Sequence, residues 1–253
     1  MPEISLSGID GRTVVVTGGG GAIGEALAVA FSSAGAHVVV ADRDRDSAER
    51  VAAKVGGTAW HVDLADTGQL TSLALECDVL VNNAGFQQVA PVEDFDPQTF
   101  SLMLRVMLEA PFLLIRAALP HMYERKFGRI INISSVHGLR ASPFKAAYVA
   151  AKHGLEGLSK VVALEGGAHG VTSNCIEPAF VRSPLIDSQI QELAELRGIS
   201  ADQVVPQVML ANSAIKRLIE PEEVASLALW LAGENAGMVT GASYTMDGGW
   251  SAR

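Results

Sequence analysis

Tyr148 and Lys152 stand four residues apart in the segment Tyr-Val-Ala-Ala-Lys, with Ser135 a short distance upstream. On a helix this spacing puts a phenol and an ammonium on the same face, where the cation favours the ionised phenol. A phenol with a pKa of ~10 otherwise keeps its proton near neutral pH. Tyr148 is therefore predicted to move a proton to or from an alcohol oxygen, with Lys152 lowering its pKa and Ser135 donating a hydrogen bond to that oxygen.

Each of these residues also has an ordinary explanation. Tyr and Lys at this spacing occur by chance on many helices, and a Ser at a strand end is more often a turn former than a catalyst. Two features upstream support the catalytic interpretation of these three residues: a glycine-rich run and the segment Asn82-Asn83-Ala84-Gly85.

The glycine-rich run, Thr17 to Gly24, follows an apolar stretch and precedes an amphipathic one. This strand-to-helix context suits a dinucleotide, because glycines let the backbone approach a pyrophosphate and the helix N-terminus favours its negative charge. A glycine run alone is as often a flexible turn. The cofactor-binding residues predicted in this loop are Gly18, Gly21, Ile23 and Gly24.

Asp42 closes the second apolar stretch. A carboxylate there can accept hydrogen bonds from both adenosine ribose hydroxyls and would repel a 2′-phosphate, so NAD is the predicted cofactor. The adjacent Arg43 works against this preference, and a helix-capping acid in a loop is the other explanation of Asp42.

Apolar, β-branched runs alternate with longer amphipathic stretches, which indicates a parallel sheet covered by helices. Strands are expected at Arg12–Thr17, Ala36–Asp42, Thr58–Val62, Asp78–Asn82, Arg129–Ser134, Val171–Ile176 and Ser243–Met246. Helices are expected at Ala22–Ala34, Asp46–Lys54, Pro97–Glu124, Ala147–Ala168 and Pro221–Ala232.

Two stretches of the chain are unusual in length. Between Asp66 and Asp78 there is room for only a short helix, whereas residues 183–217 carry short helical patterns at Ile186–Leu196 and Ala201–Leu210. The apolar spacing of the longer stretch favours an ordered lid. Since no linker or repeat divides residues 1–253, we expect one doubly wound α/β domain.

Composition restricts the functional classes. The formal net charge of −9 argues against a general affinity for nucleic acid or anionic membranes. Both cysteines, Cys77 and Cys175, fall in expected buried strands and are interpreted as reduced thiols, and six scattered histidines offer no metal-ligand spacing. No signal peptide or membrane span is evident, so a cytoplasmic location is expected.

These motifs, in this order, resemble the short-chain dehydrogenase/reductase family from about Gly11 to Gly249. The resemblance implies a single Rossmann-type domain with a seven-stranded parallel sheet and a lid over the substrate. It also implies a homotetramer built on the helices matching Pro97–Glu124 and Ala147–Ala168. Ala22 stands where the family has glycine, which predicts a slightly altered turn without loss of binding, and Ala179 also replaces a glycine usual in the family.

The same resemblance assigns further cofactor contacts. Asp63 and Leu64 would meet the adenine, Asn82, Ala84 and Gly85 would line the cofactor channel, and Pro178 would lie beside the nicotinamide. Tyr148 would face the nicotinamide end, and Lys152 would bind the nicotinamide ribose.

Met107 departs from the family pattern. An ungapped alignment through Phe86 to Phe112 places it where the family commonly has an Asn that completes a catalytic tetrad. A thioether cannot hold a proton-relay water by hydrogen bonds as an amide does. The relay is thus expected to be rebuilt or slower, unless the register of that helix differs.

Finer resemblance, in residues 85–93, 134–139, 145–148 and 183–190, is to bacterial 3-hydroxybutyrate dehydrogenases. In those enzymes the residues matching Gln87, His137, Lys145 and Gln189 hold the substrate carboxylate, beside Ser135 at the reacting oxygen. The expected substrate is thus a small keto or hydroxy acid. The alternatives are a reductase of 3-oxoacyl thioesters or other ketones, against which Lys145 argues, and a catalytically weakened NAD-binding protein.

Overall fold

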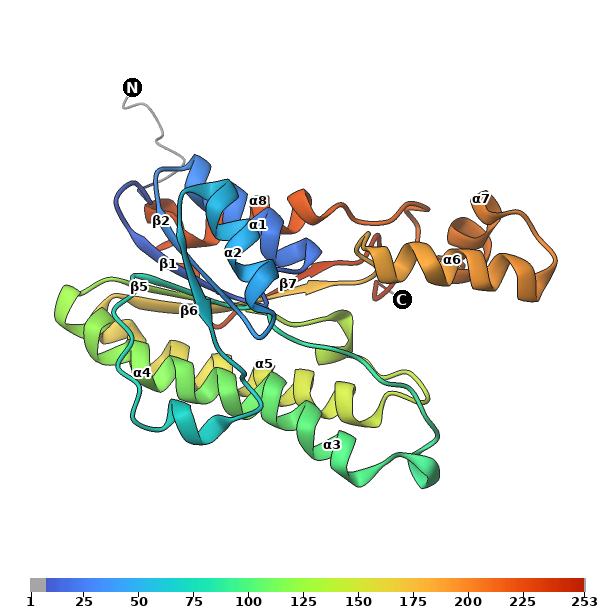
Figure 1. The fold of residues 1–253 in the computed structure, drawn as a ribbon, viewed down its shortest axis with the longest axis horizontal. Coiled ribbons are helices and arrows are strands. Elements are labelled where there is room, and N and C mark those ends of the chain that lie inside the picture. The colour runs from blue at the N-terminus through green and yellow to red at the C-terminus, as the bar shows by residue number, and fades with distance from the viewer. Residues whose placement is uncertain (1–7, 253) are drawn as a thin grey trace.

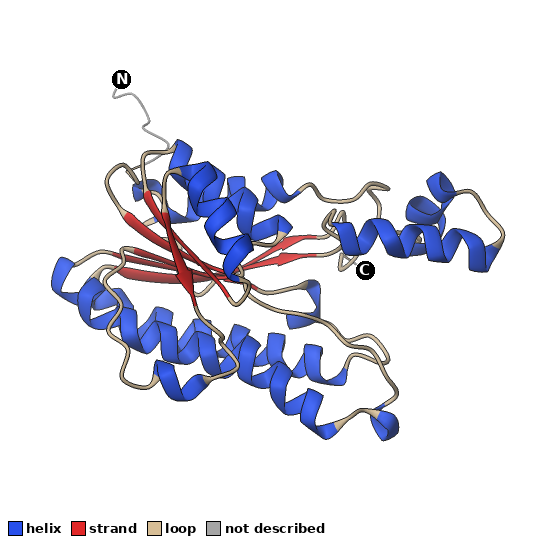
Figure 2. Ribbon diagram, in the orientation of Figure 1, coloured by secondary structure: helices blue, strands red, loops and turns tan. Residues whose placement is uncertain are grey.

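The computed structural model describes residues 8–252, apart from some side chains of one helix, Pro184–Arg197. Seven parallel strands form one sheet, as the family resemblance implied, and their order is β3-β2-β1-β4-β5-β6-β7. Their bounds are β1 Thr13–Thr17, β2 His37–Asp42, β3 Thr58–His61, β4 Val79–Asn82, β5 Gly128–Ile133, β6 Val171–Pro178 and β7 Ser243–Met246. The fold is therefore of the doubly wound, Rossmann-like α/β class (Figures 1 and 2).

Helices cover both faces of the sheet (Figure 1). On one face lie α1 (Ala22–Ser33), α2 (Arg45–Val55) and α8 (Pro221–Ala232), and on the other lie α4 (Ala110–Arg125) and α5 (Ala146–Gly166), flanked by α3 (Pro97–Leu104). Strands of such a sheet are buried on both faces, which explains their Val- and Ile-rich sequences. None of the helices within residues 8–252 is both long and apolar enough to span a bilayer.

The expected helix Pro97–Glu124 is interrupted, so that prediction is corrected. A π-helical turn, Arg105–Glu109, separates α3 from α4. Such a turn inserts one extra residue into the helix, and it is frequent at functional sites. It escapes a search for the 3.6-residue period because the apolar pattern continues on both sides.

The short helix expected between Asp66 and Asp78 is confirmed, whereas the expected position of Cys77 in a strand is wrong. Between Asp66 and Asp78 the chain forms only a 3₁₀ turn, Thr67–Leu70, in agreement with the short helix predicted there. Cys77 lies before β4 and not within a strand, although both cysteines are buried and free as expected.

Residues 183–217 form α6 (Pro184–Arg197), α7 (Ala201–Val204) and a π-helical turn (Val205–Met209). These elements extend beyond the end of the sheet (Figure 1) and carry their own small apolar cluster. The first expected helix is confirmed, whereas the second is only one α-turn followed by the π-helical turn.

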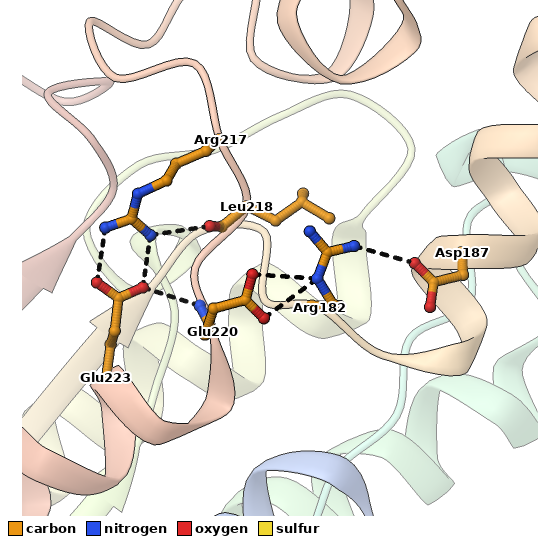
Figure 3. A network of polar contacts seen from close by, with 6 residues as sticks. All are labelled: Arg182, Asp187, Arg217, Leu218, Glu220 and Glu223. Atoms are coloured by element: carbon orange, nitrogen blue, oxygen red, sulfur yellow. Dashed lines mark hydrogen bonds and ion pairs between the residues drawn. The ribbon is translucent and has the colours of Figure 1, made fainter. Parts of the chain in front are cut away.

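Arg182 and Arg217, at the two ends of this segment, both bind the start of α8 (Figure 3). Arg182 Nε donates to both carboxylate oxygens of Glu220 at 3.1 Å, and Arg217 binds Glu223 through two nitrogens at 2.6 and 2.8 Å. Because Glu220 and Glu223 begin α8, residues 183–217 project from a fixed base.

Candidate active site

A cleft of about 520 Å³ lies at the carboxyl ends of β1, β2, β3 and β4. This is where open α/β sheets bind dinucleotides. The lining comprises Gly18, Gly21, Ala22, Ile23, Gly24, Ala41, Asp42, Arg43, Val62, Asp63, Leu64, Ala65, Asn83, Ala84, Gly85, Phe86, Leu102, Val106 and Ser183. Nine of the predicted cofactor residues lie there together: Gly18, Gly21, Ile23, Gly24, Asp42, Asp63, Leu64, Ala84 and Gly85.

The other predicted cofactor residues, Asn82, Tyr148, Lys152 and Pro178, do not line this cleft. Asn82 is buried beneath it, and its amide donates to Asn132 Oδ1 at 2.9 Å. Contact of these four residues with a cofactor stays a prediction.

The glycine-rich loop fits a pyrophosphate sterically. Gly18 has φ +61°, and a Cβ there would lie 2.8 Å from Ala84 Cα. A Cβ on Gly24 would collide with the Gly18 carbonyl. The N-cap Gly21 leaves the first N–H groups of α1 without a side-chain cap, so they are available to an anion.

Asp42 lines the cleft and is held in place by two backbone hydrogen bonds. Its Oδ2 accepts from Gly20 N at 2.9 Å and its Oδ1 accepts from Asp44 N at 3.0 Å. The helix-capping explanation is wrong, because Asp44 supplies the N-cap of α2 and accepts from Asp46 N and Ser47 N. Arg43 lines the same cleft.

The three predicted catalytic residues come from β5 and α5. Ser135 follows β5 and is buried, and its Oγ accepts from His137 N at 3.2 Å. Tyr148 and Lys152 lie on the first turns of α5, with Lys152 Nζ 5.6 Å from the centre of the Tyr148 ring. Lys152 Nζ donates to the Ile133 carbonyl at 2.7 Å.

The proton affinities of this group differ from the sequence expectation. Burial raises the pKa of Tyr148 above its ordinary value, and a hydrogen bond with Ser135 lowers it in part. Burial also lowers the pKa of Lys152, to about 8. The expected depression of the Tyr148 pKa by Lys152 is thus not found, because desolvation of the phenol dominates. Tyr148 therefore holds its proton at neutral pH, as a proton donor must.

Met107 lies in the π-helical turn and is almost fully buried. It belongs to an apolar cluster with Met103, Ala147 and Ala151, against which Tyr148 packs. Its sulfur would lie 3.1 Å from a Cβ placed on Gly85. The side chain therefore occupies the apolar wall beside Tyr148 and brings no hydrogen-bonding group for a relay.

Two of the predicted substrate residues meet beside Tyr148. Lys145 Nζ lies 3.0 Å from His137 Nε2, and the His137 ring makes edge-to-face contacts with Tyr148 and with Trp250 at centroid distances of 6.2 and 6.1 Å. Burial, followed by the charge of Lys145, lowers the pKa of His137 to about 4. The imidazole is therefore neutral near pH 7, and its Nε2 accepts from the Lys145 ammonium.

The other two residues predicted to hold the substrate carboxylate are Gln87 and Gln189. Gln87 is exposed, and Gln189 lies in α6 with its side chain outside the described part of the structure. The sequence analysis missed Trp250 and the cleft residues Ala41, Val62, Ala65, Leu102 and Val106. Ala41 and Val62 stand next to predicted contacts at strand ends, a signal that could have found them, whereas Trp250 follows the last strand without a motif.

Comparison with known proteins agrees with this architecture. Residues 18–251 match the family model described as "Enoyl-(Acyl carrier protein) reductase". A D-beta-hydroxybutyrate dehydrogenase of Rhizobium meliloti is 43% identical over 96% of this chain and 99% of its own. Another of the same name, from Cupriavidus necator, is 38% identical over 97% and 100% of the two chains.

A solved structure from Agrobacterium tumefaciens, a proposed 2-deoxy-d-gluconate 3-dehydrogenase with bound NADP, superimposes with a TM-score of 0.85. It is 31% identical and the match covers 99% of this chain and 100% of that one. From the extent of these matches and the residues assembled around the cleft, the chain belongs to the short-chain dehydrogenase/reductase family of oxidoreductases, whose members bind a nicotinamide cofactor.

Proposed function

We propose that this protein interconverts acetoacetate and (R)-3-hydroxybutyrate with NAD(H). One observation carries the substrate assignment: the Lys145 ammonium and the neutral His137 meet at 3.0 Å, beside Tyr148. A short keto acid needs a cation on one side of its carbonyl, and Lys145 supplies it. The two D-beta-hydroxybutyrate dehydrogenases among the relatives support the same substrate pair.

The bound nicotinamide would donate or accept the hydride, held by the glycine loop and Asp42. For reduction, the carboxylate binds Lys145 and donors from His137, Gln87 and Gln189, which aims the keto oxygen at Ser135 and Tyr148. The Tyr148 O–H bond then breaks as the new alcohol O–H bond forms. The raised pKa of Tyr148 keeps the donor form available through neutral pH.

A panel of ketones tests this function. Wild-type protein with NADH should show a higher kcat/KM for acetoacetate than for an uncharged methyl ketone or for an acetoacetyl thioester. A charge-assisted hydrogen bond contributes about 1.5–3 kcal/mol, so the expected preference is roughly 10- to 150-fold. Equal rates for acetoacetate and the methyl ketone would exclude the keto acid assignment.

The runner-up function is reduction of another ketone on the same scaffold. The family description as an enoyl-(acyl carrier protein) reductase and the sugar-acid dehydrogenase among the structural neighbours favour it. Lys145 disfavours a thioester, because it would lose its anionic partner. A catalytically weakened NAD-binding protein is disfavoured by the assembled Ser135, Tyr148 and Lys152.

The preference for NAD rests on Asp42. Because Gly20 and Asp44 fix its carboxylate in the cleft, it meets the adenosine ribose and repels a 2′-phosphate. Wild-type kcat/KM should favour NADH over NADPH by at least ~10-fold, or ~1.4 kcal/mol, and Asp42→Ala should narrow the ratio. Equal kcat/KM for NADH and NADPH in the wild type would contradict the assignment. Arg43, which works against the preference for NAD, would then be the first residue to test.

We also propose a lid over the substrate, a homotetrameric assembly and a cellular location for this protein. Residues 183–217 would close over the substrate, since Ser183 already lines the cleft. A homotetramer built on α4 and α5 is supported by the exposed apolar side chains Phe112, Val161 and Leu164 on those helices. The cytoplasm is the proposed location.

A further inference from the structure

Every turnover of a ketone reductase consumes one proton, so the group that donates it must be recharged. Tyr148 is flanked on one side by Met107, which carries no hydrogen-bonding group suited to this task. His137, paired with Lys145, contacts the Tyr148 ring at the substrate side, and Lys152 follows Tyr148 on the face of α5 that packs on the sheet. A proton supply to Tyr148 rests on the proposed reaction class, carbonyl reduction, and not on the identity of the ketone.

Titratable side chains recur along one face of α5. Tyr148, Lys152 and Glu156 follow each other at four-residue spacing, so they form a row that points toward the sheet. Lys152 and Glu156 are 4% and 3% exposed, which is unusual for charged side chains and requires partners. Glu156 Oε2 accepts from Ser243 Oγ at 2.6 Å, while Oε1 has no donor among the described side chains.

A second carboxyl faces this row from β6. Glu177 is fully buried, and neither of its oxygens has a donor among the described groups. Burial and the neighbouring Glu156 raise the pKa of Glu177 to about 8. A buried carboxyl beside a second carboxyl resists ionisation, so Glu177 keeps its proton at neutral pH.

The pair also reaches toward the catalytic strand end. Ser134 Oγ is buried and without a partner in the described part of the chain, and it lies with Glu156 Oε1 against the space over Gly138. Ser134 directly precedes Ser135. Glu156 therefore lies between Glu177 and the strand end that carries Ser135, with Lys152 one helical turn away on the same face of α5.

The charged and titratable surroundings of the pair come from three elements. The charge of Lys160 on α5 lowers the pKa of Glu177, and that of Asp247, after β7, raises it. The pKa of Lys152, which burial lowers, is raised in part by the charges of Cys175 and Glu156. Lys160 is exposed at the surface. Lys152 and Glu177 both have a pKa of about 8, so proton transfer between them is close to balanced.

We propose that Glu156 and Glu177 hold one shared proton and use it to recharge Lys152 and, through it, Tyr148. In reduction the Tyr148 proton goes to the alcohol oxygen, a Lys152 proton restores the phenol, the proton of the carboxyl pair restores Lys152, and solvent water restores the pair. Oxidation runs the same transfers backwards. Water carries the proton where no side chain bridges two groups. Glu156 and Glu177 are thus proton-supplying residues that act through Lys152.

The first test measures the shared proton without catalysis. Between pH ~4.5, where a free Glu titrates, and ~8, the folded protein holds this proton and the unfolded chain does not. The Tm of the wild type should therefore decline across this interval, and Glu177→Gln should remove that part of the decline. The introduced amide has the shape of a protonated carboxyl and can donate to Glu156, so this variant should fold. A wild-type slope that survives in Glu177→Gln would overturn the shared proton.

The second test measures turnover with whichever ketone the wild type reduces. Glu177→Gln and Glu156→Gln should each lower kcat for reduction on the order of 10- to 100-fold near pH 7, with the Kd of NADH unchanged. Imidazole added as an external proton donor should restore part of kcat. The matched control is Thr172→Val, which removes another buried unpartnered oxygen from the opposite face of β6 and should alter neither kcat nor the pH profile.

The outcomes separate this inference from the proposed function. If acetoacetate is a poor substrate but another ketone is reduced, the substrate assignment fails and the relay is decided with that ketone. If Glu177→Gln removes the pH dependence of Tm and leaves kcat unchanged over the whole pH profile, the pair holds a proton that catalysis does not use, and the proposed relay is wrong. A loss of kcat in Thr172→Val as large as in Glu177→Gln would equally overturn it.

Discussion

Tyr148→Phe should lower kcat by at least ~100-fold, because the variant lacks the O–H bond that gives its proton to the substrate oxygen. The phenyl ring keeps the packing of Tyr148 against the apolar cluster around Met107 and its edge contact with His137. The Kd of NADH, measured by fluorescence titration, should therefore stay within about a few-fold of the wild type. Steady-state oxidation of NADH by acetoacetate gives kcat.

A matched control for this variant is Tyr123→Phe, which removes a phenol that stacks on His169 outside the cleft. It should leave kcat unchanged. If Tyr148→Phe retains more than about a few per cent of wild-type kcat, another group donates the proton. The pH dependence of kcat for reduction gives a second check. Because the pKa of Tyr148 is raised, its phenol stays protonated through neutral pH, so deprotonation of Tyr148 should not lower kcat in that range.

The sequence contained enough to predict the sheet and the dinucleotide cleft. Strand-loop-helix alternation has a clear period, and Asp42 and the glycine loop each sit at a strand end, where the topology of a parallel sheet brings them together. The interruption of the helix at Arg105–Glu109 was not predictable in this way, because a π-helical turn keeps the apolar pattern while it shifts the register.

The sequence did not predict the contacts that depend on how separate elements pack together. His137 and Lys145 were named from a family resemblance, yet their 3.0 Å contact depends on how the turn after β5 packs on the start of α5. Glu156 and Glu177 were not singled out at all. A Glu ordinarily lies in solvent, and only the packing of α5 on β6 buries Glu156 of α5 next to Glu177 of β6.

Lys145→Ala should reduce kcat/KM for acetoacetate roughly 10- to 150-fold, since a charge-assisted hydrogen bond to a buried anion contributes about 1.5–3 kcal/mol. An uncharged methyl ketone should be reduced at nearly the wild-type rate. Burial lowers the pKa of Lys145, so the same preference for acetoacetate should weaken in the wild type as the lysine loses its proton at alkaline pH. Steady-state kinetics with both ketones across pH measure these effects.

The comparison of two substrates decides between a lost anion contact and a disturbed helix. Lys145 is the N-cap residue of α5, which carries Tyr148, so a variant that loosened the first turn would slow both ketones alike. Lys145→Met is the stricter variant, because it keeps the apolar stem and removes only the charge. If either variant slows the methyl ketone as much as acetoacetate, Lys145 positions the helix and does not bind a carboxylate. The reductase of uncharged ketones then becomes the better account of this site.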